Sequence, residues 1–382
     1  MTATVEVAIV GAGITGLSIA FHLRERGVGP VAVLERSGIG AGASGVQPGG
    51  VRRQWGTPEH CVLAQESYAF WQELDARLDA RTQTALESCG YLFAARSEQA
   101  LATLRANVEL QNAHGVPSEI AAPAALEELV PGLDASSLVG GAWCGTDGYF
   151  DRPQAVVEAF GEAAIRRGAD LTLAQVDELA PDGGGWLVRL ANGERLHATH
   201  VVLAAGYETP ALTQPLGLEL PIEREPRYVF LSAPIQERLL EPLVVAAEIG
   251  FAAKHLASGR VLAGDLGATG DPARRRVAWR QTVRRGIEEL TPMLSFVAFD
   301  LLVDGIYDTT PDHEAILGPA DDGLPGLWLA AGFSGHGFMM APAVGRALAD
   351  WICDADPGEA ADALRYTRFR NGAELRLETQ VV

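Results

Sequence analysis

The chain has 382 residues, 48% of them hydrophobic, which is enough for a large core divided between two domains. Its 49 acidic residues outnumber its 30 basic ones, and the net charge is -19. Such an acidic surface repels nucleic acid and anionic lipid, so we exclude both as main partners. The sequence has no purely apolar run of roughly eighteen residues and no N-terminal signal pattern, so we expect no membrane span and no secretion.

The four cysteines, at positions 61, 89, 144 and 353, are scattered and lack C-x-x-C spacing. The eight histidines are also dispersed, so the sequence predicts no metal site. Reduced thiols in a cytoplasmic protein are the simplest interpretation of this cysteine pattern.

Residues 5–36 have the order of a dinucleotide-binding unit. A short β-branched strand is predicted over 5–10, a helix over 17–26 and a second strand over 31–34. The turn between the first strand and the helix reads Gly-Ala-Gly-Ile-Thr-Gly, and Glu35 follows the second strand. A G-x-G-x-x-G turn alone is weak evidence, but strand, helix, strand and acid in this order predict a nucleotide site.

Each residue type in this unit has a physical role. Gly11 permits the tight turn, Gly13 lets the backbone approach a pyrophosphate, and Gly16 lets the helix pack against the strand. The backbone N–H groups of Ile14 and Thr15 offer an anion site at the helix start. The predicted function of Glu35 is to accept hydrogen bonds from both ribose hydroxyls, which disfavours a 2′-phosphate; a structural glycine turn is the alternative.

A second glycine-rich loop covers residues 36–50 and leads into Arg52 and Arg53. So much glycine favours backbone that runs against a flat ligand, whereas a mobile surface loop is the alternative. The two arginines are read either as ligand-binding groups or as ordinary surface charges.

The remaining pattern alternates helices and strands. Helices are predicted over 57–86, 98–114, 124–129, from Pro153 to 167 with Asp151 as N-cap, over 274–290 and over 338–353. Strands are predicted over 90–95, 171–175, 185–190, 194–198, 199–206, 220–233, 243–254, 261–264, 301–307 and 327–332. Ala205 and Gly206 end one strand with small residues, which lets it pass close to a nucleotide. The last strand, its glycine turn and the helix from residue 338 form a second unit whose helix start can face a ligand.

Together these motifs resemble the D-amino-acid oxidase-like FAD-dependent oxidoreductases, in particular the sarcosine oxidase and glycine oxidase branch. The matching segments follow the order of that family along nearly the whole chain: 11–16, 35–36, 42–45, 147–148, 201–206, 310–312 and 331–337. They are specific for the family and much less so for a substrate.

The resemblance implies an α/β fold of mixed α+β character. A discontinuous Rossmann-type FAD-binding domain is expected over 1–85, 147–215 and 305–382. A substrate domain on a large mixed or antiparallel sheet is expected over 86–146 and 216–304. The flavin is expected at the boundary of the two.

The resemblance also assigns cofactor contacts. They are Gly11, Gly13, Ile14, Thr15, Gly16, Glu35, Arg36, Gly42, Ala43, Ser44, Gln47, Gly49, Gly50, Val176, Ala205, Gly206, Gly332, Gly335, His336, Gly337, Phe338 and Met339. Val176 is expected to meet the adenine through its backbone. The turn over 335–339 is expected to direct helix-end N–H groups at the flavin and to stabilise negative charge there.

Three positions depart from the sarcosine oxidase pattern. Gly305 replaces the cysteine that often links the flavin, so we predict non-covalent FAD. Leu262 aligns with the lysine that supports oxygen activation, and Met339 with a substrate-facing lysine. Lys254 or His255 is a candidate replacement, with a solvated lysine as the alternative.

Arg52 matches the carboxylate-binding arginine of the family, and Tyr307 matches a tyrosine that donates to the same carboxylate. A core tyrosine satisfied locally is the alternative for Tyr307. For His336 we favour contact with the flavin over acid–base work, because hydride transfer to flavin needs no strong base.

The leading hypothesis is therefore an FAD-dependent oxidoreductase of a small amino acid or N-substituted amino acid. A C–N bond is oxidised by hydride transfer to flavin N5, the imine is hydrolysed, and oxygen or another acceptor takes the electrons. The catalytic set would be Arg52, Tyr307 and Lys254. A 2-hydroxy-acid dehydrogenase and an electron-relay or non-catalytic subunit of a complex are the alternatives. A partner subunit or a homo-oligomer is also compatible with the sequence.

Overall fold

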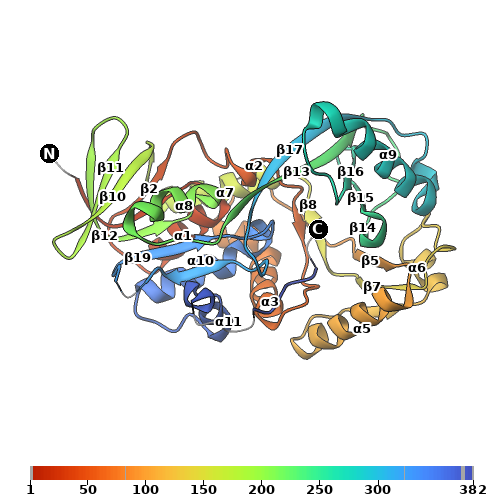
Figure 1. The fold of residues 1–382 in the computed structure, drawn as a ribbon, viewed down its shortest axis with the longest axis horizontal. Coiled ribbons are helices and arrows are strands. Elements are labelled where there is room, and N and C mark those ends of the chain that lie inside the picture. Colours follow the sequence, from red (N-terminus) through yellow and green to blue (C-terminus); the bar gives the residue numbers. More distant parts are fainter. Residues whose placement is uncertain (1–2, 82, 322, 371–374, 381–382) are drawn as a thin grey trace.

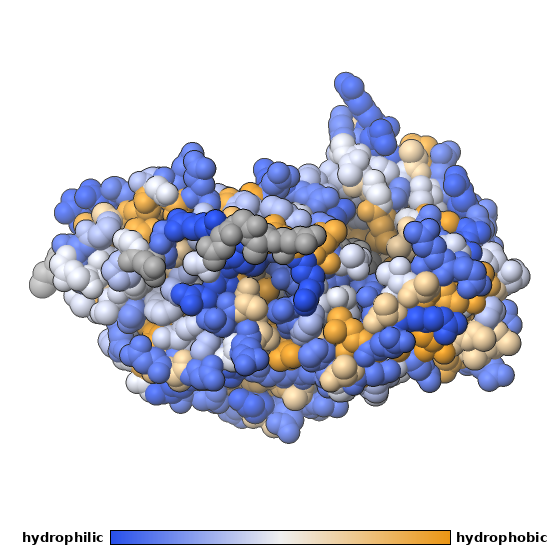
Figure 2. All heavy atoms as spheres, turned by 60° about the horizontal axis from the view of Figure 1, so that its bottom comes forward, coloured by the Kyte–Doolittle hydropathy of each residue, from blue (hydrophilic) through white to orange (hydrophobic). Residues whose placement is uncertain are grey.

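The computed structural model describes residues 3–81, 83–321, 323–370 and 375–380. They form two lobes, and each lobe contains an eight-stranded sheet (Figure 1). Figure 2 shows polar and charged residues over most of one face, with apolar residues in small groups between them. Among the helices of the described ranges, none is both long and apolar enough to cross a membrane.

The first lobe contains a sheet with a parallel centre. Its strands are β1 (Ala3–Val10), β2 (Val31–Glu35), β9 (Ala169–Leu173), β10 (Val176–Asp182), β11 (Gly185–Leu190), β12 (Arg195–Leu203), β18 (Ile316–Pro319) and β19 (Leu327–Ala331). The order is β10-β11-β12-β1-β2-β9, with β19 beside β12 and β18 beside β19. Strands β9, β2, β1, β12 and β19 run parallel, so five segments far apart in sequence end at one edge. This is the predicted Rossmann-type arrangement.

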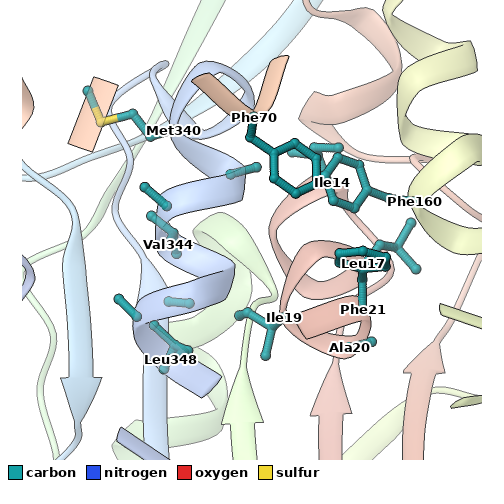
Figure 3. Close-up of a cluster of buried hydrophobic side chains, with 14 of the residues drawn as sticks. Ile14, Leu17, Ile19, Ala20, Phe21, Phe70, Phe160, Met340, Val344 and Leu348 are labelled. Atoms are coloured by element: carbon teal, nitrogen blue, oxygen red, sulfur yellow. The ribbon is translucent and has the colours of Figure 1, made fainter. Parts of the chain in front are cut away.

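Helices cover this sheet: α1 (Ile14–Glu25), α3 (Pro58–Gln72), α4 (Leu74–Leu78), α7 (Pro153–Arg166), α10 (Gly337–Ile352) and α11 (Glu359–Ala363). Helix α1 is buried over its first ten residues because α7 and α10 pack against it (Figure 3). Gly345 allows the close approach of α10, since a Cβ there would lie 2.3 Å from Ser18 Oγ. The Ser18 hydroxyl donates to the Ala341 carbonyl at 2.8 Å, and the Phe70 and Phe160 rings stack with centroids 5.6 Å apart.

The second lobe contains a mixed sheet in the order β17-β13-β16-β15-β14-β5-β7-β6. Its strands are β5 (Tyr91–Ala95), β6 (Glu119–Ala121), β7 (Gly140–Cys144), β13 (Glu223–Ser232), β14 (Leu243–Ala246), β15 (Phe251–His255), β16 (Val261–Asp265) and β17 (Phe299–Thr309). All neighbours are antiparallel except β14 and β5. Helix α9 (Pro272–Leu290) covers one face, where Trp279 stacks on Tyr228 with centroids 4.4 Å apart.

The remaining helices and strands are α2 (Ala43–Val46), β3 (Gly50–Val51), β4 (Leu86–Glu87), α5 (Glu98–Ala113), α6 (Pro123–Leu129), β8 (Gly148–Phe150) and α8 (Thr209–Thr213). Helix α5 packs against β5 and β7 of the second sheet. Strands β3, β8 and β4 form a small sheet of their own. Strand β17 crosses position 305, the expected domain boundary, so its last residues belong to the sheet of the second lobe.

Several local predictions were wrong. The strand expected over 243–254 is two antiparallel strands, β14 and β15, with a turn between them, and the two strands expected over 194–198 and 199–206 form the single strand β12. The single helix expected over 57–86 is interrupted at Glu73, which has φ -109° and ψ 11°, and α4 ends at Asp79 in the left-handed region (φ 47°). Position 82, also within that prediction, lies outside the described residues. Asp151 is not the N-cap of α7, because Arg152 occupies that position and makes no side-chain cap hydrogen bond. Pro153 at the start of the helix has no N–H, so one fewer backbone donor needs a partner there.

Candidate active site

The turn after β1 approaches β12 too closely for any side chain. A Cβ on Gly11, whose φ is 111°, would lie 2.4 Å from the Ala204 carbonyl oxygen, and one on Gly16 would lie 2.1 Å from the Gly11 carbonyl oxygen. The Ile14 N–H at the start of α1 donates to Ser44 Oγ at 3.0 Å. The glycines therefore shape a helix start that lies open to an anion and that also meets the second glycine-rich loop.

Glu35, at the end of β2, is held by backbone donors. Its Oε2 accepts from the Ala12 N–H at 2.8 Å, and its Oε1 accepts from the Ser37 N–H at 2.8 Å. Arg36 beside it pairs with Glu208 at 2.7 Å. The carboxylate is thus fixed at the end of the strand, where the acidic residue of a dinucleotide fold accepts hydrogen bonds from the ribose.

A cavity of about 610 Å³ runs from this turn to β13 and β17 of the second lobe. Its volume lies in the usual range for cofactor and ligand pockets, roughly 300 to 1,000 Å³. Predicted cofactor residues that line it are Gly11, Gly13, Ile14, Thr15, Glu35, Arg36, Gly42, Ala43, Ser44, Gln47, Val176, Ala205, Gly206, Gly335, Gly337 and Phe338. No cysteine is among its lining residues. The cavity fits a long dinucleotide, and Tyr307 lies at its far end.

Six predicted cofactor residues are not among the lining residues: Gly16, Gly49, Gly50, Gly332, His336 and Met339. Several of them shape the surroundings instead. A Cβ on Gly49 (φ 78°) would lie 2.2 Å from the Phe150 carbonyl oxygen, so this glycine lets the loop pack on β8. The Met339 carbonyl accepts from Trp71 Nε1 at 2.9 Å.

The turn before α10 is fitted around Tyr307 and Asp308. A Cβ on Gly335 (φ 92°) would lie 2.3 Å from Tyr307 Cε2, so only glycine leaves room for the ring. Asp308 Oδ2 accepts from the Gly332 N–H at 2.7 Å. Burial raises the pKa of Asp308 to about 6. Asp308 was not predicted from the sequence, although it lies next to Tyr307 and lines the same cavity.

His336 is a buried, neutral imidazole. Burial lowers its pKa well below the usual value, and the positive charge of nearby side chains lowers it further. Its ring packs on Trp55 with centroids 4.3 Å apart, and neither ring nitrogen has a hydrogen-bond partner among the described residues. This arrangement agrees with a role for the backbone of the turn and offers no acid–base partner.

Arg52 is buried with its donors engaged. Its side chain is 2% exposed, its guanidinium carbon lies 3.5 Å from the centroid of a Trp55 ring, and Nη1 donates to the Gln54 carbonyl at 2.6 Å. Nη2 donates to the carbonyl of Gln380, near the C-terminal end of the described chain. Arg52 is not among the residues that line the cavity. Arg53, whose alternative was a surface charge, is buried in an ion pair with Asp147 at 2.9 Å.

Lys254 is fully buried behind the second glycine-rich loop. Its Nζ donates to the Pro48 carbonyl and lies 3.9 Å from the centroid of the Tyr149 ring. It pairs in register with Leu262, the position that the resemblance predicts for the oxygen-activating lysine. Burial lowers the pKa of Lys254 to about 7. A solvated lysine is therefore excluded, and the buried ammonium lies against the loop that carries Gln47.

His255, the other candidate replacement, has both ring nitrogens engaged with backbone. Nδ1 accepts from the Leu239 N–H at 3.1 Å, and Nε2 lies 3.0 Å from the Gly259 carbonyl. These contacts give it a structural role in the turn between β15 and β16.

Arg227 is a second lining residue that was not predicted from the sequence. This residue lies on β13 opposite Gly305 of β17, and it lines the cavity with Val229. Tyr228 and Phe230, which alternate with them, belong to the core cluster under α9. The alternation along the strand could have identified it, because a charged residue at position 227 lies on the opposite face from the core residues at 228 and 230.

The chain matches the family of FAD dependent oxidoreductases designated DAO over residues 6–351. It belongs to that family. The predicted fold and family are confirmed, and so is the prediction that the chain is an FAD-dependent oxidoreductase. The glycines and the cavity described above are compatible with the cofactor that this family binds.

Three similar proteins illustrate the family. The 4-methylaminobutanoate oxidase (formaldehyde-forming) of Paenarthrobacter nicotinovorans is 27% identical over 96% of this chain, which spans 46% of that protein. The sarcosine oxidase subunit beta of Rhizobium meliloti (strain 1021) is 26% identical over 96% of this chain and 89% of its own length. The structure of L-proline dehydrogenase from P. horikoshii superposes with a TM-score of 0.89 at 27% identity, covering 99% of this chain and 100% of that one. This chain thus spans about half the length of the first relative and nearly all of the other two.

Proposed function

We propose that this oxidoreductase acts on a small amino acid or N-substituted amino acid and oxidises the bond between its nitrogen and the adjacent carbon. The observation that carries the proposal is one cavity that joins the dinucleotide turn to Tyr307 and Arg227 on the second sheet. The names of the three relatives support it, since sarcosine, L-proline and 4-methylaminobutanoate are all amino acids.

FAD, when bound, supplies a two-electron acceptor for the hydride of that carbon. The chain would hold it through Gly11, Gly13 and Glu35 at one end and through the start of α10 at the other. Val229, Val303 and Phe338 give the far end of the cavity apolar walls. Such walls exclude water and strengthen the electrostatic interactions made there.

Tyr307 is proposed to orient the substrate, because its ring is fixed against Gly335 and its side chain lines the cavity. The family pattern predicts Arg52 as the carboxylate ligand, but in this structure the carbonyls of Gln54 and Gln380 accept from its guanidinium. The substrate carboxylate therefore has either to displace the Gln380 carbonyl or to find another cation.

Lys254 is proposed to hold the glycine-rich loop through the Pro48 carbonyl and to supply charge beside it. With a pKa of about 7, it changes charge near neutral pH. A protonated Lys254 would favour the reduction of oxygen through its positive charge, and oxygen or another molecule is the proposed electron acceptor.

A subunit role is a second proposal, and the name of the Rhizobium relative, a beta subunit, supports it. In that case the partner would share the reaction or receive the electrons. The native mass of the purified protein, measured alone and with the proteins that copurify with it, distinguishes a lone chain from a complex.

The test of the main proposal is turnover with an artificial electron acceptor. Sarcosine, glycine, proline, D-amino acids and 2-hydroxyglutarate are supplied in turn, and the carbonyl product of imine hydrolysis is trapped with a hydrazine. We expect acceptor reduction and a trapped carbonyl with an amino acid. Turnover of 2-hydroxyglutarate alone would replace the proposal with hydroxy-acid oxidation, and no turnover with any compound would favour the subunit role.

A further inference from the structure

Two basic side chains line the cavity in the part of the chain that the structure describes, Arg36 and Arg227. They lie at opposite ends. Arg36 follows Glu35 at the nucleotide turn and pairs with Glu208. Arg227 lies on β13, and its guanidinium carbon is 5.2 Å from the centroid of the Tyr307 ring. The end of the cavity assigned to the substrate therefore has one lining cation.

Arg52, which does not line the cavity, has little capacity left for a ligand. Its Nη1 donates to Gln54 and its Nη2 to Gln380, and Trp55 covers its face at 3.5 Å. The segment that supplies the Gln380 carbonyl is firmly anchored. The carboxylate of Glu378, which is fully buried, accepts hydrogen bonds from the Gly56 N–H at 2.9 Å and from the N–H of Gln380, two residues further along the chain, at 2.7 Å.

Arg227, in contrast, has few acceptors for its five N–H groups. One terminal nitrogen pairs with Glu225 at 3.1 Å, and the other reaches the Leu266 carbonyl only at 3.5 Å. Its Nε is buried without a partner among the described residues. The side chain is 26% exposed, and the surface it exposes includes part of the cavity wall.

Both arginines act electrostatically on Tyr307, and Arg227 acts more strongly than Arg52. Burial raises the pKa of Tyr307, and the positive charges of Arg227 and, less strongly, Arg52 oppose that effect. Asp304 and Asp308 also line the cavity near Tyr307, and Glu225 pairs with Arg227. Asp304 and Asp308 repel an anion at this end, and Arg227 is the cation among the described lining residues there that can attract one.

We infer that Arg227, not Arg52, receives the carboxylate of the substrate, and that Arg52 is a structural cation closed off by the C-terminal segment 377–380. This inference rests on the proposed amino-acid oxidation. It names the charged group that selects an amino acid over an amine without a carboxylate. A planar fork of donors on Arg227 suits a carboxylate, whereas a lysine offers only a point charge.

The experiment uses the FAD-loaded protein and four variants: Arg227→Met, Arg227→Lys, Arg52→Lys and Arg284→Met. Arg284 is an exposed residue of α9 whose partner is Glu288, and it controls for the loss of any arginine. Acetate is the probe for carboxylate binding, followed by calorimetry and by the flavin absorbance. In parallel, the amino acid that turns over is compared with the corresponding amine without the carboxylate. The FAD content of each variant shows that it has folded.

We expect Arg227→Met to weaken acetate binding and raise the KM of the amino acid by about 10- to 100-fold, the usual range for a hydrogen bond to a charged group. Arg227→Lys should recover part of this loss. Arg284→Met should stay within about twofold of the wild type, and Arg52→Lys should lose less acetate affinity than Arg227→Met. The KM of the amine should not change with Arg227→Met.

Acetate binding unchanged in Arg227→Met, or lost in Arg52→Lys with FAD retained, would overturn the assignment and return the role to Arg52. Both outcomes leave the proposed oxidation intact, because the amino acid still turns over in the wild type. The proposed function itself fails only if no amino acid reacts with the wild-type protein. Equal KM values for the amine and the amino acid in the wild type would also contradict a carboxylate ligand of any kind.

Discussion

The two ends of the cavity hold their charged groups in different ways. At the nucleotide end, Glu35 is fixed by backbone N–H groups from the same strand–turn–helix unit, including those of Ala12 and Ser37. Near the substrate end, the buried cations of Arg52 and Lys254, which do not line the cavity, are held by the carbonyls of distant segments, those of Gln380 and Pro48. The first end is built locally, and the second is built by tertiary contacts.

This difference has energetic consequences. A group held by its own turn depends on glycines that no other residue replaces, because a Cβ would overlap backbone atoms that have no freedom to move. A buried cation held by tertiary contacts depends on burial and pH, since desolvation disfavours its charged form. Steric changes should therefore affect the nucleotide end most, and pH should affect the substrate end most.

The largest effect is expected for Gly16→Ala, which places a Cβ 2.1 Å from the Gly11 carbonyl oxygen. The turn cannot keep its shape, so we expect the purified protein to lose most of its FAD. The ratio of flavin to protein absorbance measures this loss. Gly323→Ala, whose Cβ would have nothing within 4 Å, is the matched control. Full FAD content in Gly16→Ala would contradict the claim that FAD binding depends on the absence of a side chain at this position.

Glu378→Ala tests the anchor of the C-terminal segment. The carboxylate accepts from the N–H groups of Gly56 and Gln380 and from the Thr57 hydroxyl, and the change leaves these buried donors unpaired. We expect a loss of about 2 to 4 kcal/mol in the free energy of unfolding, measured by denaturant titration. Exposed Glu241→Gln is the control. A loss below about 0.5 kcal/mol, the range of ordinary surface substitutions, would mean that the segment does not hold Arg52.

Lys254→Met tests the buried cation. With a pKa of about 7 in the folded chain against 10.5 for a free side chain, the protonated form favours unfolding. The free energy of unfolding of the wild type therefore increases as pH rises from about 7 towards 10.5. Between pH 6 and pH 9 the contribution of this lysine is about 2 to 3 kcal/mol. The wild type should gain that much relative to Lys254→Met in unfolding experiments at the two pH values. Parallel pH curves for the two proteins would contradict a buried, neutralised lysine.

Asp308→Asn is expected to have a smaller effect of the opposite sign. Burial raises the pKa of Asp308 to about 6 from 3.8, so the folded state favours the protonated carboxyl group. The free energy of unfolding therefore decreases as pH rises through 6 and the group ionises. Between pH 5 and pH 7, the wild type should lose about 1 kcal/mol relative to Asp308→Asn. The amide still accepts from the Gly332 N–H, so the turn should keep its shape. Equal slopes for both proteins would show that Asp308 is already ionised at pH 5.

The same difference explains what the sequence predicted. The order of the glycines, Glu35 and the two strands follows from local pattern, and these residues meet in the structure as expected. Tyr307 also lies in the cavity, because strand periodicity places it there. The closure of Arg52 by Gln380 was not predictable, since it joins positions 328 residues apart. Arg227 and Asp308 were missed because their burial depends on how two sheets pack, which periodicity alone does not give.

The most direct test of the proposed oxidation is an anaerobic titration of the yellow FAD-loaded protein with amino acids and with 2-hydroxyglutarate, observed through flavin absorbance. We predict that one amino acid bleaches the flavin stoichiometrically and that air restores the colour, quickly for an oxidase and slowly for a dehydrogenase. A flavin that only 2-hydroxyglutarate bleaches, or that no compound bleaches, would contradict the oxidation of an amino acid at this site.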